Sequence, residues 1–255
     1  VFVIRCKETG EGVMIDAAAP WLVYDHEYPD KIVRLHVYKI SSWHGTPGGR
    51  EGQRISWEDP GALSVAPLMA AYGRALDALR LPAVIAVAYA DGAERRAFLG
   101  QVERALQSGL GMLVLRERRM MPAQFAQMSR QVSDMAHRYG ATVLVESGKA
   151  LASHTTADGA HVCCCKLPSM AASPHGAFWS ASCKTAGDLD RAAALGAAFV
   201  TVRPPMAGDQ KAVDWAAFEA LIEQSAVPVF ASGAVAPDDL ATALHAGAHG
   251  GALPP

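Results

Sequence analysis

The pattern of apolar and polar positions changes near residue 80. Before it, the stretch 32–38 places an apolar residue, Val33, Leu35 or Val37, at every second position. A period of two is typical of a half-buried β-strand, and Tyr28-Pro29-Asp30 predicts a turn in front of it. After residue 80, short apolar runs alternate with segments whose apolar residues recur every three or four positions, which indicates strands and helices in alternation.

The second region, residues 81–255, contains apolar runs that predict eight strands. Crossover helices between such strands favour parallel pairing, and an unbroken series of eight favours a closed barrel over an open doubly wound sheet. The predicted fold class is therefore α/β, a (β/α)8 TIM barrel whose last helix is missing. The strand runs are 83–90, 111–118, 141–147, 159–164, 177–183, 198–205 and 227–233, and an eighth begins at 249–253.

A barrel of this kind carries its chemistry at the carboxyl ends of its strands. The residues that end the predicted strands are therefore the first candidates for a functional site. They are Arg116 to Arg118, Glu146 and Ser147, Cys163 to Lys166, Ser182 to Lys184, Arg203 to Pro205, and Ser232 and Gly233.

Composition narrows the class of protein. The 255 residues are 51% hydrophobic and 19% charged, with a formal net charge of −2. Near-neutral charge argues against a broad surface for nucleic acid or anionic membrane. No apolar run approaches the roughly 18 residues of a membrane span, and no secretory signal opens the chain, so we expect a cytoplasmic protein. The chain begins at Val1 and stops soon after its eighth strand starts, so we expect a piece of something longer, cut at both ends.

The five cysteines are an odd count, and three of them are adjacent. This is a poor disulfide framework, and the C-x-x-C pairs of a zinc site are absent. We interpret them as small thiols buried near a strand end, with a redox role as the alternative. They are Cys6, Cys163, Cys164, Cys165 and Cys183.

Residues 43–57, WHGTPGGREGQRISW, carry two tryptophans around a glycine-rich loop. Together with Tyr28-Pro29-Asp30 they resemble the carboxyl-terminal half of a MutT-type Nudix hydrolase, and we assign residues 1–80 to that part of a Nudix α+β domain. The resemblance implies hydrolysis of nucleoside triphosphates, notably oxidised guanine nucleotides, with Mg²⁺. It also implies a catalytic and metal-binding role for Glu51.

The segment 5–13, RCKETGEGV, departs from the Nudix pattern. It stands where the family's glutamate-rich box would end, but Cys6, Thr9 and Gly10 occupy the glutamate positions. Clustered carboxylates are what hold the hard Mg²⁺ ions of such a site. We therefore interpret residues 1–80 as a remnant without hydrolase activity, in which the tryptophan-flanked loop is a former site rim that now serves as a hairpin.

The second region resembles thiamine phosphate synthase and its TenI-like relatives across residues 81–255. The resemblance rests on VLRER at 114–118 and ADGAHVCCCKL at 157–167. It implies the joining of a pyrimidine pyrophosphate to a thiazole phosphate, with Mg²⁺ assisting, and hence a small phosphorylated partner. The implied phosphate- or substrate-binding residues are Arg116, Arg118, His161, Ser182, Ser232 and Gly233.

The barrel also departs from the family pattern. Glu146-Ser147-Gly148 replaces a metal-binding N-D-R, and Lys166 replaces a second metal-binding aspartate, so Glu146 is left as a substitute ligand in a weak site. Lys184 stands where relatives often have a histidine. It would act as a base only if desolvation lowered its pKa. The alternatives are a solvated lysine at Lys184 and surface ion pairs at the two arginines.

Three hypotheses remain. The first is an enzyme of thiamine metabolism behind a Nudix domain. The second is a non-catalytic module that binds a phosphorylated heterocycle, and the third is a degenerate fragment of an active bifunctional parent. A strand edge left uncovered in the first region would predict aggregation or oligomerisation, such as a homodimer.

Overall fold

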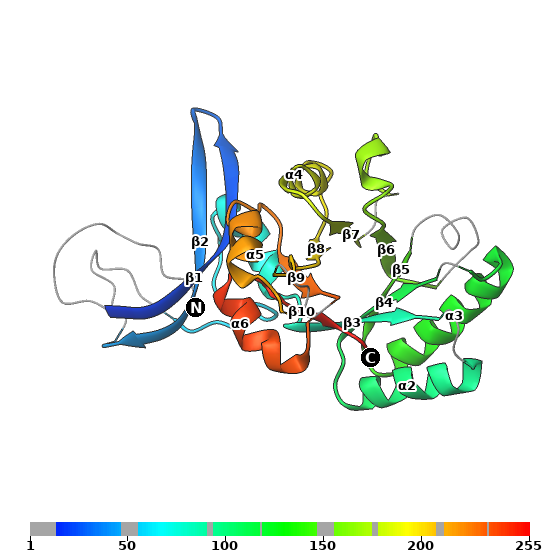
Figure 1. Cartoon of the computed structure of the whole chain (residues 1–255). Helices are drawn as coiled ribbons and strands as arrows, with labels where there is room; N and C mark the ends of the chain where they lie inside the picture. The colour runs from blue at the N-terminus through cyan, green and yellow to red at the C-terminus, as the bar shows by residue number, and fades with distance from the viewer. Residues whose placement is uncertain are drawn as a thin grey trace.

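The computed structural model describes residues 14–46, 56–90, 94–117, 119–146, 156–174, 178–207, 212–233 and 235–255. Eight parallel strands close into a barrel in the order β10-β3-β4-β5-β6-β7-β8-β9 (Figure 1). This confirms the eight-stranded barrel expected from the apolar runs. The strands are β3 (Val84–Tyr89), β4 (Met112–Arg116), β5 (Thr142–Glu146), β6 (Gly159–Val162), β7 (Phe178–Cys183), β8 (Phe199–Val202), β9 (Val229–Ser232) and β10 (Gly250–Leu253).

Helices cover the outside of the barrel between most strands. Thr185 begins α4 with a capping box: its hydroxyl accepts from Asp188 N, and Asp188 Oδ2 accepts from Thr185 N. Most of the segment between β5 and β6 lies outside the described residues. The outer elements are α2 (Arg95–Gln107), α3 (Pro122–Arg138), η2 (Leu167–Ser169), α4 (Ala186–Ala194), α5 (Trp215–Ile222), η3 (Pro237–Asp239) and α6 (Leu240–His245).

The interior of the barrel has an apolar layer. Side chains alternate between interior and exterior along each strand, so Ile85, Val114, Leu144, Phe199 and Phe230 form a cluster separate from those beneath the helices. The rings of Phe199 and Phe230 meet edge to face, with their centroids 5.2 Å apart. The barrel is therefore a packed core, and water is excluded from beneath the carboxyl ends of its strands.

The first region contains a long antiparallel hairpin of β1 (Met14–Tyr28) and β2 (Lys31–His44) (Figure 1). In β2 the side chains of Val33, Leu35 and Val37 are half-buried, which confirms the predicted period-two strand. The other elements of this region are η1 (Ala70–Tyr72) and α1 (Gly73–Leu79). One face of the hairpin packs on α1 through an apolar cluster of Trp21, Leu22, Tyr24, Ala75 and Ala78.

The hairpin docks on the amino-terminal end of the barrel. Val23 N donates to Ser225 O at 2.9 Å, just before β9, and Lys39 Nζ donates to His249 O at 2.9 Å, just before β10. Trp21 stacks on the His249 ring with centroids 5.6 Å apart. Burial lowers the pKa of Lys39 to about 8. The hairpin thus covers the end of the barrel opposite to the expected site.

Trp43 and Trp57, the two tryptophans of the 43–57 stretch, stack with ring centroids 5.9 Å apart. This contact brings the two ends of the stretch together, but most of the residues between them lie outside the described residues, so the predicted hairpin stays a prediction. Residues 47–55, including Glu51, lie outside the described residues, as do residues 1–13 with the altered Nudix segment.

Candidate functional site

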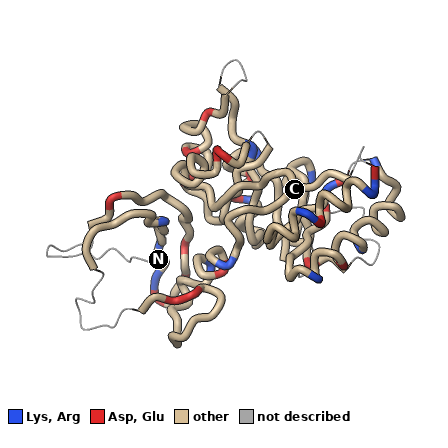
Figure 2. The backbone as a smooth tube through the Cα atoms, turned by 90° about the horizontal axis from the view of Figure 1, so that it is seen from below, with Lys and Arg blue, Asp and Glu red and all other residues tan. Residues whose placement is uncertain are grey.

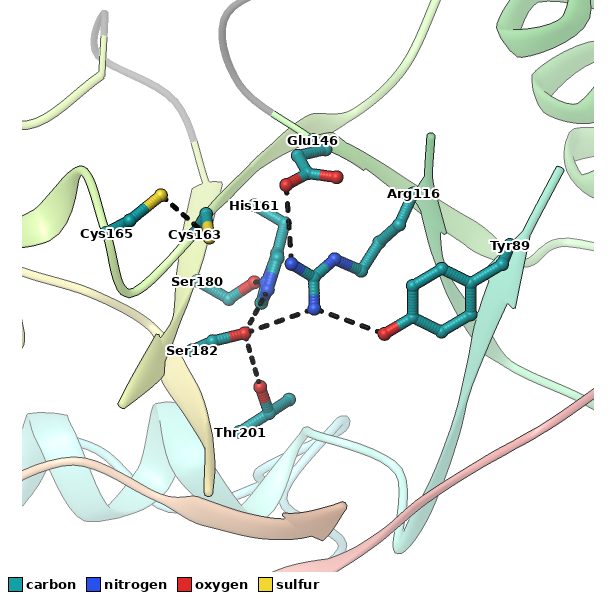
Figure 3. A network of polar contacts seen from close by, with 9 residues as sticks. All are labelled: Tyr89, Arg116, Glu146, His161, Cys163, Cys165, Ser180, Ser182 and Thr201. Atoms are coloured by element: carbon teal, nitrogen blue, oxygen red, sulfur yellow. Dashed lines mark hydrogen bonds and ion pairs between the residues drawn. The ribbon is translucent and has the colours of Figure 1, made fainter. Parts of the chain in front are cut away.

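A polar layer lies above the apolar one, at the carboxyl ends of β3 to β8 (Figure 3). The register of the sheet builds it, because neighbouring strands place their last interior residues side by side. The structure thereby brings together Arg116, Glu146, His161 and Ser182 from the sequence-based candidates. The register pairs are Tyr89 with Arg116, Glu146 with His161, His161 with Ser180, and Ser182 with Thr201.

Arg116 is the centre of this layer and is only 8% exposed. Its Nη1 donates to Tyr89 Oη at 3.3 Å and lies 3.5 Å from Ser182 Oγ, and its Nη2 donates to Glu146 Oε1 at 3.3 Å. Burial acts to lower the pKa of Arg116, but the hydrogen bond and charge of Glu146 outweigh it and raise that pKa. The guanidinium is therefore charged and held in one orientation (Figure 3).

Two polar atoms of the Arg116–Glu146 pair form no hydrogen bond among the described residues. Arg116 Nε and Glu146 Oε2 are buried, and neither meets a hydrogen-bond partner within the described part of the chain. A buried polar atom without a partner carries a free-energy cost of about 1–3 kcal/mol. Within the described part of the chain, the pair thus keeps one N–H donor and one carboxylate oxygen without a hydrogen-bond partner.

His161 lies fully buried between two serines. Its Nδ1 is 2.8 Å from Ser180 Oγ, and its Nε2 is 2.8 Å from Ser182 Oγ. Desolvation, and then the charge of Arg116, lowers the pKa of His161 to about 3. The ring is therefore neutral near pH 7, and both of its nitrogens are engaged in holding hydroxyls.

Ser182 links the whole network. Its hydroxyl contacts the ring of His161 and lies 3.1 Å from Thr201 Oγ1, in addition to its approach to Arg116. Ser180, Thr201 and Tyr89 were not among the sequence-based site candidates. The available signal was alternation along each strand, since these residues stand at interior positions near the strand ends.

The other sequence-based candidates lie at the rim or outside the described residues. Lys184 is exposed just after β7, where its backbone N–H donates to Asp188 Oδ2. Ser232 is half-buried at the end of β9. Gly233 follows it in the left-handed region (φ 86°), and a Cβ at this position would lie only 3.3 Å from Cγ and Cδ of Arg203. Arg118, like Glu51, lies outside the described residues.

The described residues at the carboxyl ends of the strands do not fit a Mg²⁺ site of the expected kind. Glu146 was the predicted barrel ligand, but one of its oxygens accepts from Arg116. Among the described residues, no three His, Cys, Asp or Glu side chains are grouped so that they could hold a metal ion. Mg²⁺ requires near-octahedral oxygen ligands with enough negative charge, and here a cation already occupies the carboxylate.

Charges of both signs are interspersed over the described chain (Figure 2). This distribution agrees with the small net charge and gives no support to a binding face for a nucleic-acid polymer. Within the same residues, no helix has the length and apolar character needed to cross a membrane.

The residues of the barrel match a known protein family. The family described as thiamine monophosphate synthase (TMP-TENI) matches residues 84–254, so the hairpin and α1 precede the matched region. A putative thiamine-phosphate synthase of Geobacter sulfurreducens is 30% identical over 166 residues, covering 62% of this chain and 78% of that protein. The thiamine-phosphate synthase of Limosilactobacillus fermentum is 31% identical over 166 residues, covering 60% and 77%.

Solved structures show the same fold. The thiamine phosphate pyrophosphorylase of Pyrococcus furiosus superimposes with a TM-score of 0.53 at 17% sequence identity. The superposition covers 67% of this chain and 84% of that protein. At this identity the likeness concerns the fold alone.

Proposed function

This chain belongs to the thiamine monophosphate synthase family, and we propose that its barrel binds a small phosphorylated heterocycle of thiamine metabolism, a thiazole or pyrimidine phosphate. The observation that carries the proposal is the buried guanidinium of Arg116 at the carboxyl end of the barrel, whose Nε–H has no hydrogen-bond partner among the described residues. A planar guanidinium suits the oxygens of a phosphate, and low local polarity strengthens the contact.

The surrounding residues support anion binding in two ways. Glu146 and Tyr89 hold the guanidinium by its two Nη atoms, so little conformational entropy is lost when a ligand arrives. Ser232 and Gly233 lie at the carboxyl end of β9, the seventh strand of the barrel in chain order. Loops after this strand often hold phosphate in proteins of this fold. We propose that Arg116 contacts the ligand and that the Ser232–Gly233 turn, with Arg118, completes the phosphate site.

The same residues favour binding over catalysis. His161 uses both ring nitrogens to hold Ser180 and Ser182, so we propose that it positions Ser182 and does not transfer a proton to the ligand. Lys184 is exposed just after β7, outside the polar layer, so we propose no catalytic role for it. Because the described residues do not fit Mg²⁺, we propose that ligand binding is independent of Mg²⁺.

Thermal unfolding with added ligand tests the proposal. Thiazole phosphate or thiamine phosphate at about one hundred times its dissociation constant should stabilise the protein by about 2.7 kcal/mol. The shift should be equal with Mg²⁺ and with a chelator, and the unphosphorylated thiazole should give none. Absence of a shift with every thiamine intermediate would refute ligand binding. Formation of thiamine phosphate from both substrates with Mg²⁺ would instead show a working synthase.

For residues 1–80 we propose a MutT-type remnant whose present role is structural. The docking of Trp21 and Lys39 on His249 and the stacking of Trp43 on Trp57 support a structural role. Incubation of the protein with nucleoside triphosphates and Mg²⁺, including oxidised guanine nucleotides, should release no pyrophosphate. Release of pyrophosphate would restore a catalytic role to Glu51.

We further propose that the protein acts in the cytoplasm and can associate as a homodimer through the hairpin. The support for a dimer is that β1 and β2 pair only with each other among the described strands, which leaves an outer edge on each. Size-exclusion chromatography with light scattering would report a dimer mass if this edge pairs, and a monomer mass would refute it.

A further inference from the structure

A pair of thiols lies at the edge of the polar layer and plays no part in the proposed ligand site. Cys163 directly follows β6, and Cys165 lies two residues further on, in the turn that leads to η2. Cys165 Sγ is 3.1 Å from Cys163 Sγ (Figure 3). That distance exceeds the length of a disulfide bond, about 2.05 Å, by only about 1 Å.

The backbone holds the two sulfur atoms together. Lys166 N donates to Cys163 O at 2.9 Å, and Leu167 N donates to the same oxygen at 3.2 Å. This closed turn folds Cys165 back over Cys163. Cys165 is exposed and Cys163 is half-exposed, so a small oxidant can reach both.

The two thiols differ in acidity. Partial burial acts to raise the pKa of Cys163, but donors from Cys165 and Cys164 and the charge of Arg116 outweigh it and lower that pKa. The donors are the backbone N–H of Cys165 and the two neighbouring thiols. The hydrogen bond that Cys165 gives to Cys163, followed by desolvation, raises the pKa of Cys165. Cys163 is therefore the more acidic thiol of the pair, and the thiolate is the form that attacks a peroxide.

We propose that Cys163 and Cys165 form a redox-active thiol pair that a peroxide converts into an intramolecular disulfide. The Cys163 thiolate attacks one oxygen of hydrogen peroxide, the O–O bond breaks, and Cys163 becomes a sulfenic acid while hydroxide leaves. Cys165 sulfur then attacks the sulfenic sulfur, the S–O bond breaks, and the S–S bond forms as water leaves. In total two thiols lose two protons and two electrons, and hydrogen peroxide is reduced to two waters.

Tryptic peptides of this chain allow the disulfide to be detected. Trypsin cleavage after Lys149 and Lys166 releases residues 150–166, which contain Cys163, Cys164 and Cys165 and no other cysteine. Cleavage after Lys184 releases residues 167–184, which contain only Cys183. Cys183 is buried, and its burial raises the pKa of its thiol, so it serves as an internal control.

The test treats the reduced full-length protein with hydrogen peroxide, then unfolds it, alkylates the remaining thiols and measures both peptides by mass spectrometry. Peptide 150–166 should change from three alkylated cysteines to one, with the loss of two hydrogen atoms. Peptide 167–184 should stay fully alkylated. Three alkylated cysteines after treatment, or a disulfide to a second copy on a non-reducing gel, would overturn the proposal.

Single variants identify the pair. Cys164→Ser should still lose two hydrogen atoms and then carry no alkylated cysteine in this peptide. Cys163→Ser and Cys165→Ser should form no disulfide within the peptide, and Cys165→Ser should accumulate a sulfenic acid that dimedone traps at Cys163. A disulfide that persists in Cys165→Ser would assign the reaction to the adjacent cysteines and overturn the pairing.

Discussion

The barrel buries one histidine near each of its ends, in different surroundings. At the carboxyl end, His161 lies between two serine hydroxyls beside the charge of Arg116. At the amino end, His249 lies between the rings of Trp21 and Phe230, and its Nδ1 is 3.5 Å from Lys39 Nζ. The first belongs to a network of polar side chains, whereas the second joins the hairpin to the barrel.

The two histidines show that burial alone does not mark a functional site. Desolvation, together with a nearby cation, lowers the pKa of His161 to about 3 and that of His249 to about 4. A low histidine pKa therefore marks burial in both places and a ligand site in neither by itself. The neighbours make the difference, since hydroxyls and a guanidinium are hydrogen-bonding groups that suit a polar ligand, whereas the ring faces stacked at His249 are apolar.

The largest expected effect comes from removing the charge at the carboxyl end. Arg116→Met leaves Glu146 buried without its partner, which should lower the free energy of unfolding by about 3–5 kcal/mol. It should also abolish the thermal shift given by thiazole phosphate. Urea unfolding and thermal unfolding with ligand measure the two effects.

The double variant Arg116→Met/Glu146→Met is the matched control. It removes both charges, so most of the lost stability should return while the ligand-induced shift stays absent. A ligand shift that survives in the double variant would show that Arg116 is not the group that binds the ligand.

At the amino end, Trp21→Ala should lower the free energy of unfolding by about 3 kcal/mol, because the side chain is 5% exposed and packs on both α1 and His249. Tyr38→Ala, on the same hairpin but 50% exposed, should change it by less than about 0.5 kcal/mol. The ligand-induced shift should persist in both. Its loss in Trp21→Ala, measured where that variant is folded, would show that the two ends are coupled.

A smaller effect distinguishes the two serines around His161. Ser182→Ala removes a hydroxyl shared by His161 and Thr201 and should cost about 1–2 kcal/mol of unfolding free energy. Ser180→Ala removes a hydroxyl whose partner is His161 and should cost less. Chemical denaturation of both variants measures the order. An equal or reversed order would contradict the central place of Ser182 in the network.

The smallest effect is a dependence of the free energy of unfolding on pH, to which the histidines at both ends of the barrel contribute. In the unfolded chain each histidine binds a proton near its ordinary pKa of 6.5, but in the folded protein it does so only near 3 or 4. Stability should therefore fall as the pH drops below about 6.5, by less than about 1 kcal/mol per histidine between about pH 7 and pH 6. His161→Gln and His249→Gln should each reduce this slope in equilibrium unfolding, and an unchanged slope in both would refute the assignment.

Much of the fold follows from the local pattern. The short apolar runs predicted all eight barrel strands, because a strand buried on both faces needs apolar residues throughout. The period of two in residues 32–38 predicted a half-buried strand for the same kind of reason. The position of Arg116, Glu146, His161 and Ser182 at the ends of predicted strands also marked them as candidates.

Such local patterns could not predict which residues far apart in the sequence would be in contact. Glu146 was predicted as a substitute metal ligand because it stands where the resembling family has its metal-binding N-D-R, and the barrel register places it against Arg116, 30 residues away. Lys39 and His249 are 210 residues apart and meet only because the hairpin docks on the barrel. Tyr89 stood in an apolar run and gave no sign that its hydroxyl would meet a guanidinium.

The sequence by itself therefore determined the barrel and the polar character of its strand ends, because hydrophobic periodicity and turn chemistry act over a few neighbouring residues. Only the tertiary structure decided which charges neutralise each other and which hydroxyls hold His161. Closure of the sheet sets these contacts, since it brings together strand ends that lie tens of residues apart along the chain.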